Sequence, residues 1–323
     1  MRAGHAKLKA ILDGVRGRED LLARRHSDPV AFVHRYESSD DREIVALIAA
    51  ACAFGNVTAI RMKLEELFER IREIDTSPAR AADDPAAVKR VMRGWKHRLF
   101  RGEDLAALMI GARHVQRETG TLGRAFAAEL ARTDSLRPAT TSLRLATLSL
   151  SASFREALAC FLERIRRAGG LPMPGERPPD GRRGPAHLLP DARAGSAAKR
   201  IFLFLRWMIR PADGIDLGLW SHDIPPSRLL MPLDVHIHKL ARNVGLTRRQ
   251  DLSWKTAAEV TAKLALLDAA DPTRYDFSLC HLGMVQRCPS RKDPAPGGRC
   301  EGCGVKPVCI HWPRDKARRS VRR

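Results

Sequence analysis

Four cysteines close to the C-terminus are the residues whose type and spacing predict chemistry most clearly. They follow the pattern C-x11-C-x2-C-x5-C, and the compact C-x2-C step lets two thiolates reach one centre. The Pro- and Gly-rich stretch between the first two cysteines can wrap around such a centre without regular structure. The pattern therefore predicts a metal site with the ligands Cys288, Cys300, Cys303 and Cys309.

The spacing alone does not identify the metal. Four thiolates hold zinc in a tetrahedron, and they equally hold an iron–sulfur cluster of the [4Fe–4S] type. Cys280 is an alternative ligand in place of Cys288, although a thiol inside a helix is more often part of a core. The odd total of seven cysteines does not fit a secreted disulfide framework, so we expect thiols that are kept reduced in the cytoplasm.

The charge balance points to a polyanionic partner. Lys and Arg number 57 against 37 Asp and Glu, which gives a formal net charge of +20. No apolar run reaches the about 18 residues that a membrane span needs, and the N-terminus lacks the apolar stretch of a secretion signal. We therefore expect a cytoplasmic monomer that does not bind membranes.

The elements that must position these residues are expected to be helices. Apolar residues recur at three- and four-residue spacing, and no convincing series of alternating strands is present. The Gly-, Pro- and Arg-rich residues 169–195 predict an exposed connection. Asp28-Pro29 predicts the cap of a short helix. Further helices are expected at roughly 42–71 in two parts separated by Gly55-Asn56, and at 84–100, 103–116, 121–131, 151–168, 196–210, 233–244, 254–267 and 275–285.

Other common motifs are missing from the sequence. There is no G-x-x-x-x-G-K-[ST] phosphate loop and no G-x-G-x-x-G after a strand, which excludes nucleotide hydrolysis and dinucleotide redox chemistry. His236 and His238 diverge on a helix, so they are not expected to bind one ion together. Trp207 and Trp220 are expected in the core rather than stacked on a base.

The last three cysteines follow a predicted helix that ends at His281-Leu282-Gly283. This arrangement resembles the C-terminal iron–sulfur motif of the endonuclease III-like enzymes, which belong to the helix-hairpin-helix DNA glycosylase superfamily. The family motif is written C-x6-C-x2-C-x5-C, so the first loop of this chain is five residues longer. The resemblance implies an iron–sulfur cluster rather than zinc, and Cys288 is the ligand at which this chain departs from the family.

Residues 232–237 (PLDVHI) resemble the family's V-D-T-H-I/V segment, whose aspartate is catalytic and begins a helix. The resemblance assigns this role to Asp234. The chemistry agrees, because the free amides and the dipole at a helix N-terminus stabilise a carboxylate, and a fixed anion can stabilise an oxocarbenium-like sugar. A plain helix cap is the alternative.

The family's catalytic lysine follows a hairpin written L-P-G-V-G-x-K, and residues 189–199 are the comparable stretch. Lys199 stands four residues after Gly195, as in the family, but the second glycine is missing, so the hairpin is degenerate. Between Lys199 and Asp234 lie 34 residues, about twice the interval in endonuclease III-like enzymes. The archaeal 8-oxoguanine glycosylases of the same superfamily also have a long interval.

A helix that begins near Lys199 would carry a cationic stripe. At 100° per residue, Lys199, Arg206 and Arg210 share one side of the helix, apart from its apolar residues. A neighbouring cation such as Arg206 would favour the neutral amine, which is the form able to attack C1′ of a sugar. The alternative is a lysine that extends to solvent beside a hydrated stripe.

Further DNA contacts are implied by the resemblance. Residues 43–56 resemble the first barrel helix of the superfamily, which ends beside the flipped nucleotide, so Asn56 is expected to contact DNA, with a simple turn residue as the alternative. Phosphate contacts are expected from five cations of the stripe and of the cysteine loop, namely Arg206, Arg210, Arg291, Lys292 and Arg299.

A second pattern joins K-R-x5-R-W-M, which begins at Lys199, to D-x-G-x-W at residues 216–220. Together with the Asp234 segment, it resembles a bacterial family of glycosylase-related proteins without an assigned function. This resemblance is closer, and it supplies no substrate.

These patterns imply an all-α, two-lobed fold of the helix-hairpin-helix glycosylase type with a C-terminal four-cysteine loop. The expected lobes are a helical barrel at 41–210 and a second lobe made of 1–40 and 211–312, followed by a basic tail at 313–323. The implied function is base excision repair of double-stranded DNA in the bacterial nucleoid, by a DNA glycosylase with AP-lyase activity. A monofunctional glycosylase, in which Asp234 directs water, and a non-catalytic nucleic-acid-binding protein with a structural metal site are the alternatives.

Overall fold

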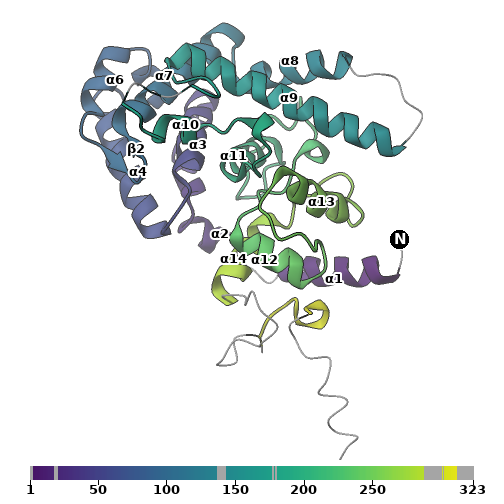
Figure 1. Ribbon diagram of the computed structural model, residues 1–323. Coiled ribbons are helices and arrows are strands. Elements are labelled where there is room, and N and C mark those ends of the chain that lie inside the picture. The colour runs from purple at the N-terminus through teal and green to yellow at the C-terminus, as the bar shows by residue number, and fades with distance from the viewer. Residues whose placement is uncertain are drawn as a thin grey trace, which may run out of the picture.

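The computed structural model is mostly helical, as the apolar spacing predicts (Figure 1). It describes residues 3–17, 21–136, 143–176, 178, 180–286, 300 and 302–310. Within these ranges the strands are β1 (Lys96–His97) and β2 (Phe100–Arg101), which pair antiparallel. No helix of the described ranges is long and apolar enough to cross a membrane.

Most of the expected helices are present within a few residues of their predicted ends. Asn56 separates the two helices of residues 42–71, and Asp28 caps a 3-10 helix whose first residue is Pro29. In chain order, the helices are α1 (Ala3–Gly17), α2 (Leu21–Arg25), η1 (Pro29–Arg35), α3 (Ser39–Cys52), α4 (Val57–Arg72), α5 (Pro78–Ala81), α6 (Pro85–Val91), α7 (Gly102–Thr119), α8 (Leu122–Ser135), α9 (Leu143–Gly169), α10 (Gly184–Leu188), η2 (Ala192–Ala194), α11 (Lys199–Ile209), η3 (Pro226–Arg228), α12 (Val235–Asn243), α13 (Trp254–Ala265), α14 (Asp276–Gln286) and η4 (Lys306–Val308).

The helix expected over 84–100 is wrong in its second half. Helix α6 ends at Val91, Gly94 then takes a φ of +78°, and the chain continues as the β1–β2 hairpin. Residues 95–98 alternate between buried and exposed, which is the period of a strand rather than of a helix. The residues expected as a connection at 169–195 also contain the short helix α10, whose second residue is Pro185.

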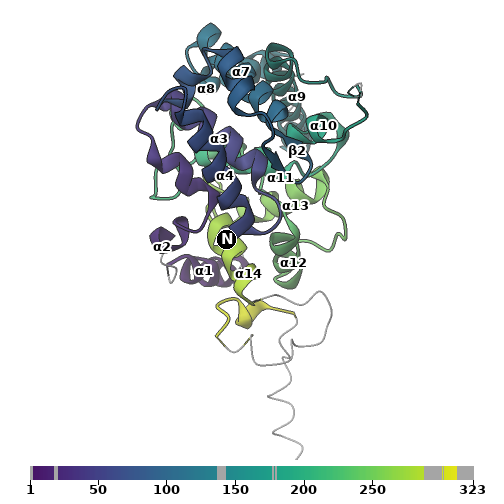
Figure 2. The ribbon, with the colours of Figure 1, turned by 90° about the vertical axis from the view of Figure 1, so that its left-hand side faces the viewer.

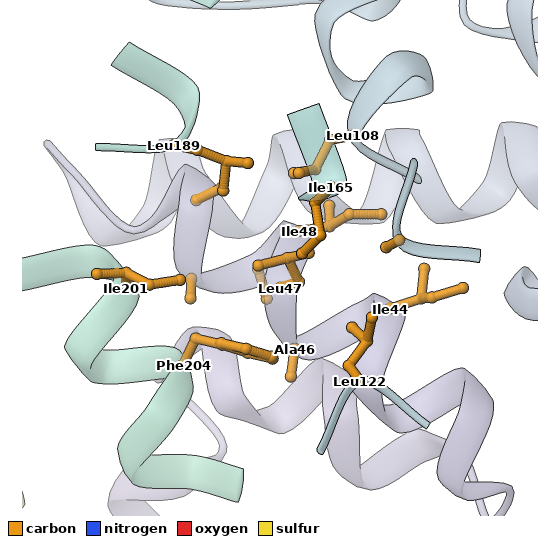
Figure 3. Packing of buried hydrophobic residues seen from close by; sticks show 14 of the residues in the cluster. Ile44, Ala46, Leu47, Ile48, Leu108, Leu122, Ile165, Leu189, Ile201 and Phe204 are labelled. Carbon is orange, nitrogen blue, oxygen red and sulfur yellow. The ribbon is translucent and has the colours of Figure 1, made fainter. Parts of the chain in front are cut away.

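The larger hydrophobic core surrounds α3, which is buried on every side. Its Ile44, Leu47 and Ile48 lie among apolar side chains from α7, α9 and α11 (Figure 3). Helices α7, α8 and α9 cover one end of this core, and α11 runs through the middle of the molecule (Figure 1). The end of α3 and the start of α11 are therefore fixed against each other.

A second hydrophobic core joins α1, α12, α13 and α14. Figures 1 and 2 both show α1, α12 and α14 gathered at the end of the molecule opposite α7 and α9. Val305, between the third and fourth of the predicted cysteine ligands, is buried in this core with Val15 of α1. The larger core also takes in residues 30–33 and several side chains of 215–229, so it draws on both of the expected lobes.

Candidate active site

Lys199 and Asp234 lie next to each other, although 34 residues separate them in the chain. The distance from Lys199 Nζ to Asp234 Oδ2 is 3.7 Å. The lysine side chain is 30% exposed and the aspartate side chain 16%, so both can be reached from solvent. The fold thus brings together the two residues to which the resemblance assigns catalytic roles.

The two carboxylate oxygens of Asp234 have different surroundings. Asp234 is the N-cap of α12, and its Oδ1 accepts hydrogen bonds from the backbone amides of His236 (2.9 Å) and Ile237 (2.8 Å). The other oxygen, Oδ2, faces Lys199 and the thiol of Cys280. The helix therefore fixes the carboxylate by one oxygen and leaves the other for chemistry.

Lys199 is the first residue of α11, where its amine meets the end of α3. Its Nζ lies 3.4 Å from the carbonyl oxygen of Ala53, and the neighbouring Arg200 donates to the carbonyl of Ala51 at 2.7 Å. Two cations thus satisfy carbonyls at a helix C-terminus, where the dipole favours positive charge. These bonds hold the start of α11 in place and direct the lysine toward Asp234.

The hairpin between α10 and α11 has partners inside the protein. Gly195 takes a φ of +83° and its carbonyl accepts from the amide of Trp254 at 2.8 Å. The amide of Ala197 donates to Leu252, and that of Ala198 donates to the hydroxyl of Ser196. Because these two amides already have acceptors, this part of the hairpin does not offer them to phosphate. The degenerate hairpin pattern in the sequence agrees with this arrangement.

The thiol of Cys280 lies beside Asp234. Its Sγ lies 3.7 Å from Asp234 Oδ2, on the helix α14 that packs against α12. Burial, together with the nearby Asp234, raises the pKa of this thiol well above its usual range, so it is a neutral donor. From the sequence, Cys280 was expected only in the core or as a metal ligand.

The expectation that Arg206 and Arg210 contact DNA is wrong, because both guanidinium groups are buried in ion pairs. Arg206 is 2% exposed and pairs with Asp216 at 3.0 Å and with Asp276. Arg210 pairs with Asp216 and also with two further aspartates, Asp213 and Asp271. The helical wheel placed both arginines on the correct side of α11, but that side faces carboxylates of the interior. Arg206 is therefore a balanced charge and not the free cation expected beside Lys199.

The D-x-G-x-W residues hold α11 and α3 together. Asp216 binds both arginines, and Gly218 takes a φ of +67° where the chain passes close to the backbone of Arg210. Trp220 is buried, as expected, and its Nε1 donates to Glu43 of α3 at 2.7 Å. Burial raises the pKa of Glu43, which also accepts bonds from Gln116 and from the amides of Leu122 and Gly123.

Asn56 lies at the turn that follows α3 and is exposed. Its side chain accepts from the amide of Ala59 at 3.2 Å, which makes it the N-cap of α4. This is the turn role expected as the alternative for Asn56. A contact with DNA stays a prediction.

The β1–β2 hairpin packs beside the end of α3. Its His97 and Phe100 are buried and both pack against the ring of Phe54, at centroid distances of 5.4 and 5.2 Å. Lys96 and Arg101 lie on the opposite, exposed face of the two strands. The turn between the strands carries the exposed Arg98 and Leu99, and the Arg98 guanidinium lies 5.4 Å from the centroid of the Phe54 ring. Within the described part of the chain, none of these cations forms an ion pair, so this face is available to an anionic partner.

The described cysteines of the C-terminal segment are Cys300, Cys303 and Cys309. The amide of Cys303 donates to the carbonyl of Cys300 at 3.2 Å, and the amide of Lys306 donates to the carbonyl of Cys303 at 3.1 Å. Burial raises the pKa of the Cys303 thiol. No three metal-binding side chains are gathered closely enough to hold an ion within the described residues. Cys288 and the predicted phosphate contacts Arg291, Lys292 and Arg299 lie outside those residues.

Comparison with known proteins gives one match. A family described as "Protein of unknown function (DUF2400)" matches residues 28–285. This range includes Lys199, Asp234, Cys280 and the aspartates that bind α11, and it stops before the C-terminal cysteines. No curated protein and no solved structure matches the chain.

Proposed function

We propose that this chain, which belongs to the DUF2400 family of unknown function, is a DNA glycosylase of the helix-hairpin-helix type with AP-lyase activity. The observation that carries the proposal is the 3.7 Å contact between Lys199 and Asp234 at the partly exposed ends of two helices. A lysine beside a fixed carboxylate is the pair that the resemblance implies for attack on a sugar carbon.

Each of the two residues has a defined role in this proposal. Asp234, fixed through Oδ1, presents Oδ2 to the positive charge that develops at C1′ when the bond to the base breaks. Lys199 attacks C1′ and forms a Schiff base, after its ammonium has released a proton. The lysine side chain is 30% exposed, so this proton passes to water and Asp234 stays ionised.

The DNA is proposed to lie across the exposed face of the β1–β2 hairpin and the Asn56 turn. Both features adjoin the end of α3, where the carbonyl of Ala53 meets Lys199. The cations of the hairpin supply phosphate contacts, and the exposed Leu99 lies among them. A base turned out of the duplex here would reach the lysine and the aspartate.

An iron–sulfur cluster is proposed as a structural group of the C-terminal segment. Cys300, Cys303, Cys309 and Cys288 would hold it, and four soft thiolate donors suit either iron–sulfur or zinc. The resemblance favours the iron–sulfur cluster. Because residues 302–310 pack against α1 and the end of α12, the cluster would order this segment without taking part in base removal.

The second candidate is a non-catalytic nucleic-acid-binding protein. The observation that favours it is the plain structural role of Asp234 as a helix cap. In that case DNA binding would depend strongly on salt, and Asp234→Asn would change nothing measurable.

A panel of duplex oligonucleotides, each with one damaged base, tests the proposal. Base release is measured with and without alkali, because strand nicking without alkali reports the lyase step. We expect release from at least one lesion, with nicking that is lost in Lys199→Ala. Release without nicking would make the enzyme monofunctional, and no release from any duplex would overturn the proposal.

A further inference from the structure

The Lys199–Asp234 pair has buried neighbours that have no role in the proposed chemistry. They are Cys280 and Asp276, which lie one turn apart on α14, and Arg206 on α11. Asp276 is 3% exposed and Arg206 2%, so neither reaches DNA. All three residues lie within the part of the chain that matches the family.

We propose that Cys280 is a positioning residue, whose thiol donates to Asp234 Oδ2 and holds that oxygen toward Lys199. The inference rests on the proposed function, because it concerns the same carboxylate. Asp234 Oδ1 is fixed by two amides, but Oδ2 has only the lysine and the thiol as neighbours with hydrogen to donate among the described residues. When Lys199 leaves this contact to attack C1′, Cys280 is the donor that remains.

Arg206 and Asp276 fix the position of the helix that carries the thiol. The Arg206–Asp276 ion pair joins α11, which begins at Lys199, to α14, which carries Cys280. Arg206 is itself held by Asp216 at 3.0 Å, so α14 is joined to the D-x-G-x-W segment as well. The lysine, the aspartate and the thiol therefore keep their mutual distances through one buried ion-pair network.

The charges around the thiol require it to be a neutral donor. Asp234, Asp276 and Asp28 act on Cys280 with negative charge, and Lys199 acts on it with positive charge. A thiolate among three carboxylates would be unfavourable, and a protonated thiol beside Oδ2 is favourable. The group is thus suited to donating one hydrogen bond and unsuited to acting as a nucleophile.

A matched pair of substitutions separates positioning from packing. Cys280→Ser keeps a donor at the same carbon, whereas Cys280→Ala removes it and leaves an apolar methyl group. If the residue only fills space in the interior, the alanine variant should be at least as good as the serine variant, because serine brings an unneeded hydroxyl. If it positions Asp234, the order is reversed.

The measurement is the rate of borohydride-trapped adduct formation on a duplex that contains one abasic site. We expect the rate to fall about tenfold in Cys280→Ala, with a value near wild type in Cys280→Ser, and with DNA affinity unchanged in both. Asp276→Asn should also slow the reaction without weakening DNA binding. Asp271→Asn is its control, since it removes the same charge from a partner of Arg210.

The outcomes distinguish the positioning role of Cys280 from the proposed lyase activity. An alanine variant as fast as the serine variant, with an active wild type, would overturn the positioning role and leave the proposed function standing. A wild type that forms no adduct would overturn the lyase activity, and the inference that rests on it would fall with it.

Discussion

At the scale of single residues, the two carboxylate oxygens of Asp234 have different roles, one structural and one in the proposed chemistry. Oδ1 caps α12 through two amide bonds, and Oδ2 lies 3.7 Å from the amine of Lys199. Asparagine caps helices about as well as aspartate, because its side-chain oxygen accepts the same amide bonds. The cap and the charge can therefore be separated by mutation.

Asp234→Asn is expected to lower the rate of base release at least about a hundredfold, since the anion that stabilises positive charge at C1′ is lost. The free energy of unfolding should change little, whereas Asp234→Ala should lose about 1 kcal/mol with the cap. Single-turnover kinetics and urea denaturation measure the two quantities. Full activity in Asp234→Asn would leave the residue as a cap only.

The sequence predicts some residues of the site better than others. Asp234 and Lys199 stand in local segments that resemble a family motif, and each begins a helix, so their types and positions could be predicted. Cys280 could not be assigned, because its partner is 46 residues away in the chain and only the packing of α14 on α12 brings them together. A signal did exist in the spacing of Asp276 and Cys280, which places both on one side of a helix.

At the scale of the elements, α11 is joined to its surroundings by buried ion pairs. The helical wheel of residues 199–210 predicted that the arginines share one side, and the structure confirms this phase. It could not predict what that side faces, since Asp216, Asp271 and Asp276 come from loops and from α14. The helical period of the sequence predicts on which side of the helix an arginine lies. Its ion-pair partner depends on the tertiary structure.

Burial raises the pKa of Asp276 to about 6, so this carboxyl stays protonated to a higher pH in the folded protein than in the unfolded chain. Below pH about 4 the carboxyl is protonated in both the folded and the unfolded state, and it contributes no pH dependence. As the pH rises from about 4 to about 6, the unfolded chain releases the proton first, so stability falls. Relative to Asp276→Asn, wild type should lose stability over this range in urea denaturation. A pH-independent difference between the two proteins would contradict the assignment.

The C-terminal cysteines and Cys280 lie in different surroundings, and this gives a test by spectroscopy. Cys303→Ser is expected to remove the visible absorption of the iron-loaded protein, because it takes away one of the predicted thiolate ligands. Cys280→Ser, whose thiol faces Asp234, should leave the absorption unchanged. Loss of the absorption in Cys280→Ser, with retention in Cys303→Ser, would reverse the assignment of ligands.

At the scale of the whole molecule, only some of the cations behind the formal charge of +20 can attract DNA. Many arginines are paired with carboxylates, including those of α11, and these add little to the attraction of DNA. The exposed face of the β1–β2 hairpin carries cations without such pairs, next to the end of α3. Net charge therefore predicts an anionic partner, and the arrangement of ion pairs indicates where it binds.

Replacing Lys96, Arg98 and Arg101 with alanine is expected to weaken DNA binding and to reduce its dependence on salt. The slope of log affinity against log salt should fall by about 0.9 for each phosphate contact that is lost. The control removes the same number of charges from α7 and α8, in Arg117, Arg124 and Arg132. Equal slopes in both triple variants would place the DNA elsewhere.

The central claim of this account is that Lys199, held beside Asp234, attacks the sugar of a damaged nucleotide. Borohydride reduction of a mixture of the protein and abasic-site DNA tests it most directly, because a Schiff base is then fixed as a stable covalent adduct. Wild type is predicted to give the adduct and Lys199→Ala to give none, while the matched Arg200→Lys variant keeps it. An undiminished adduct in Lys199→Ala, or none with wild type, would contradict the claim.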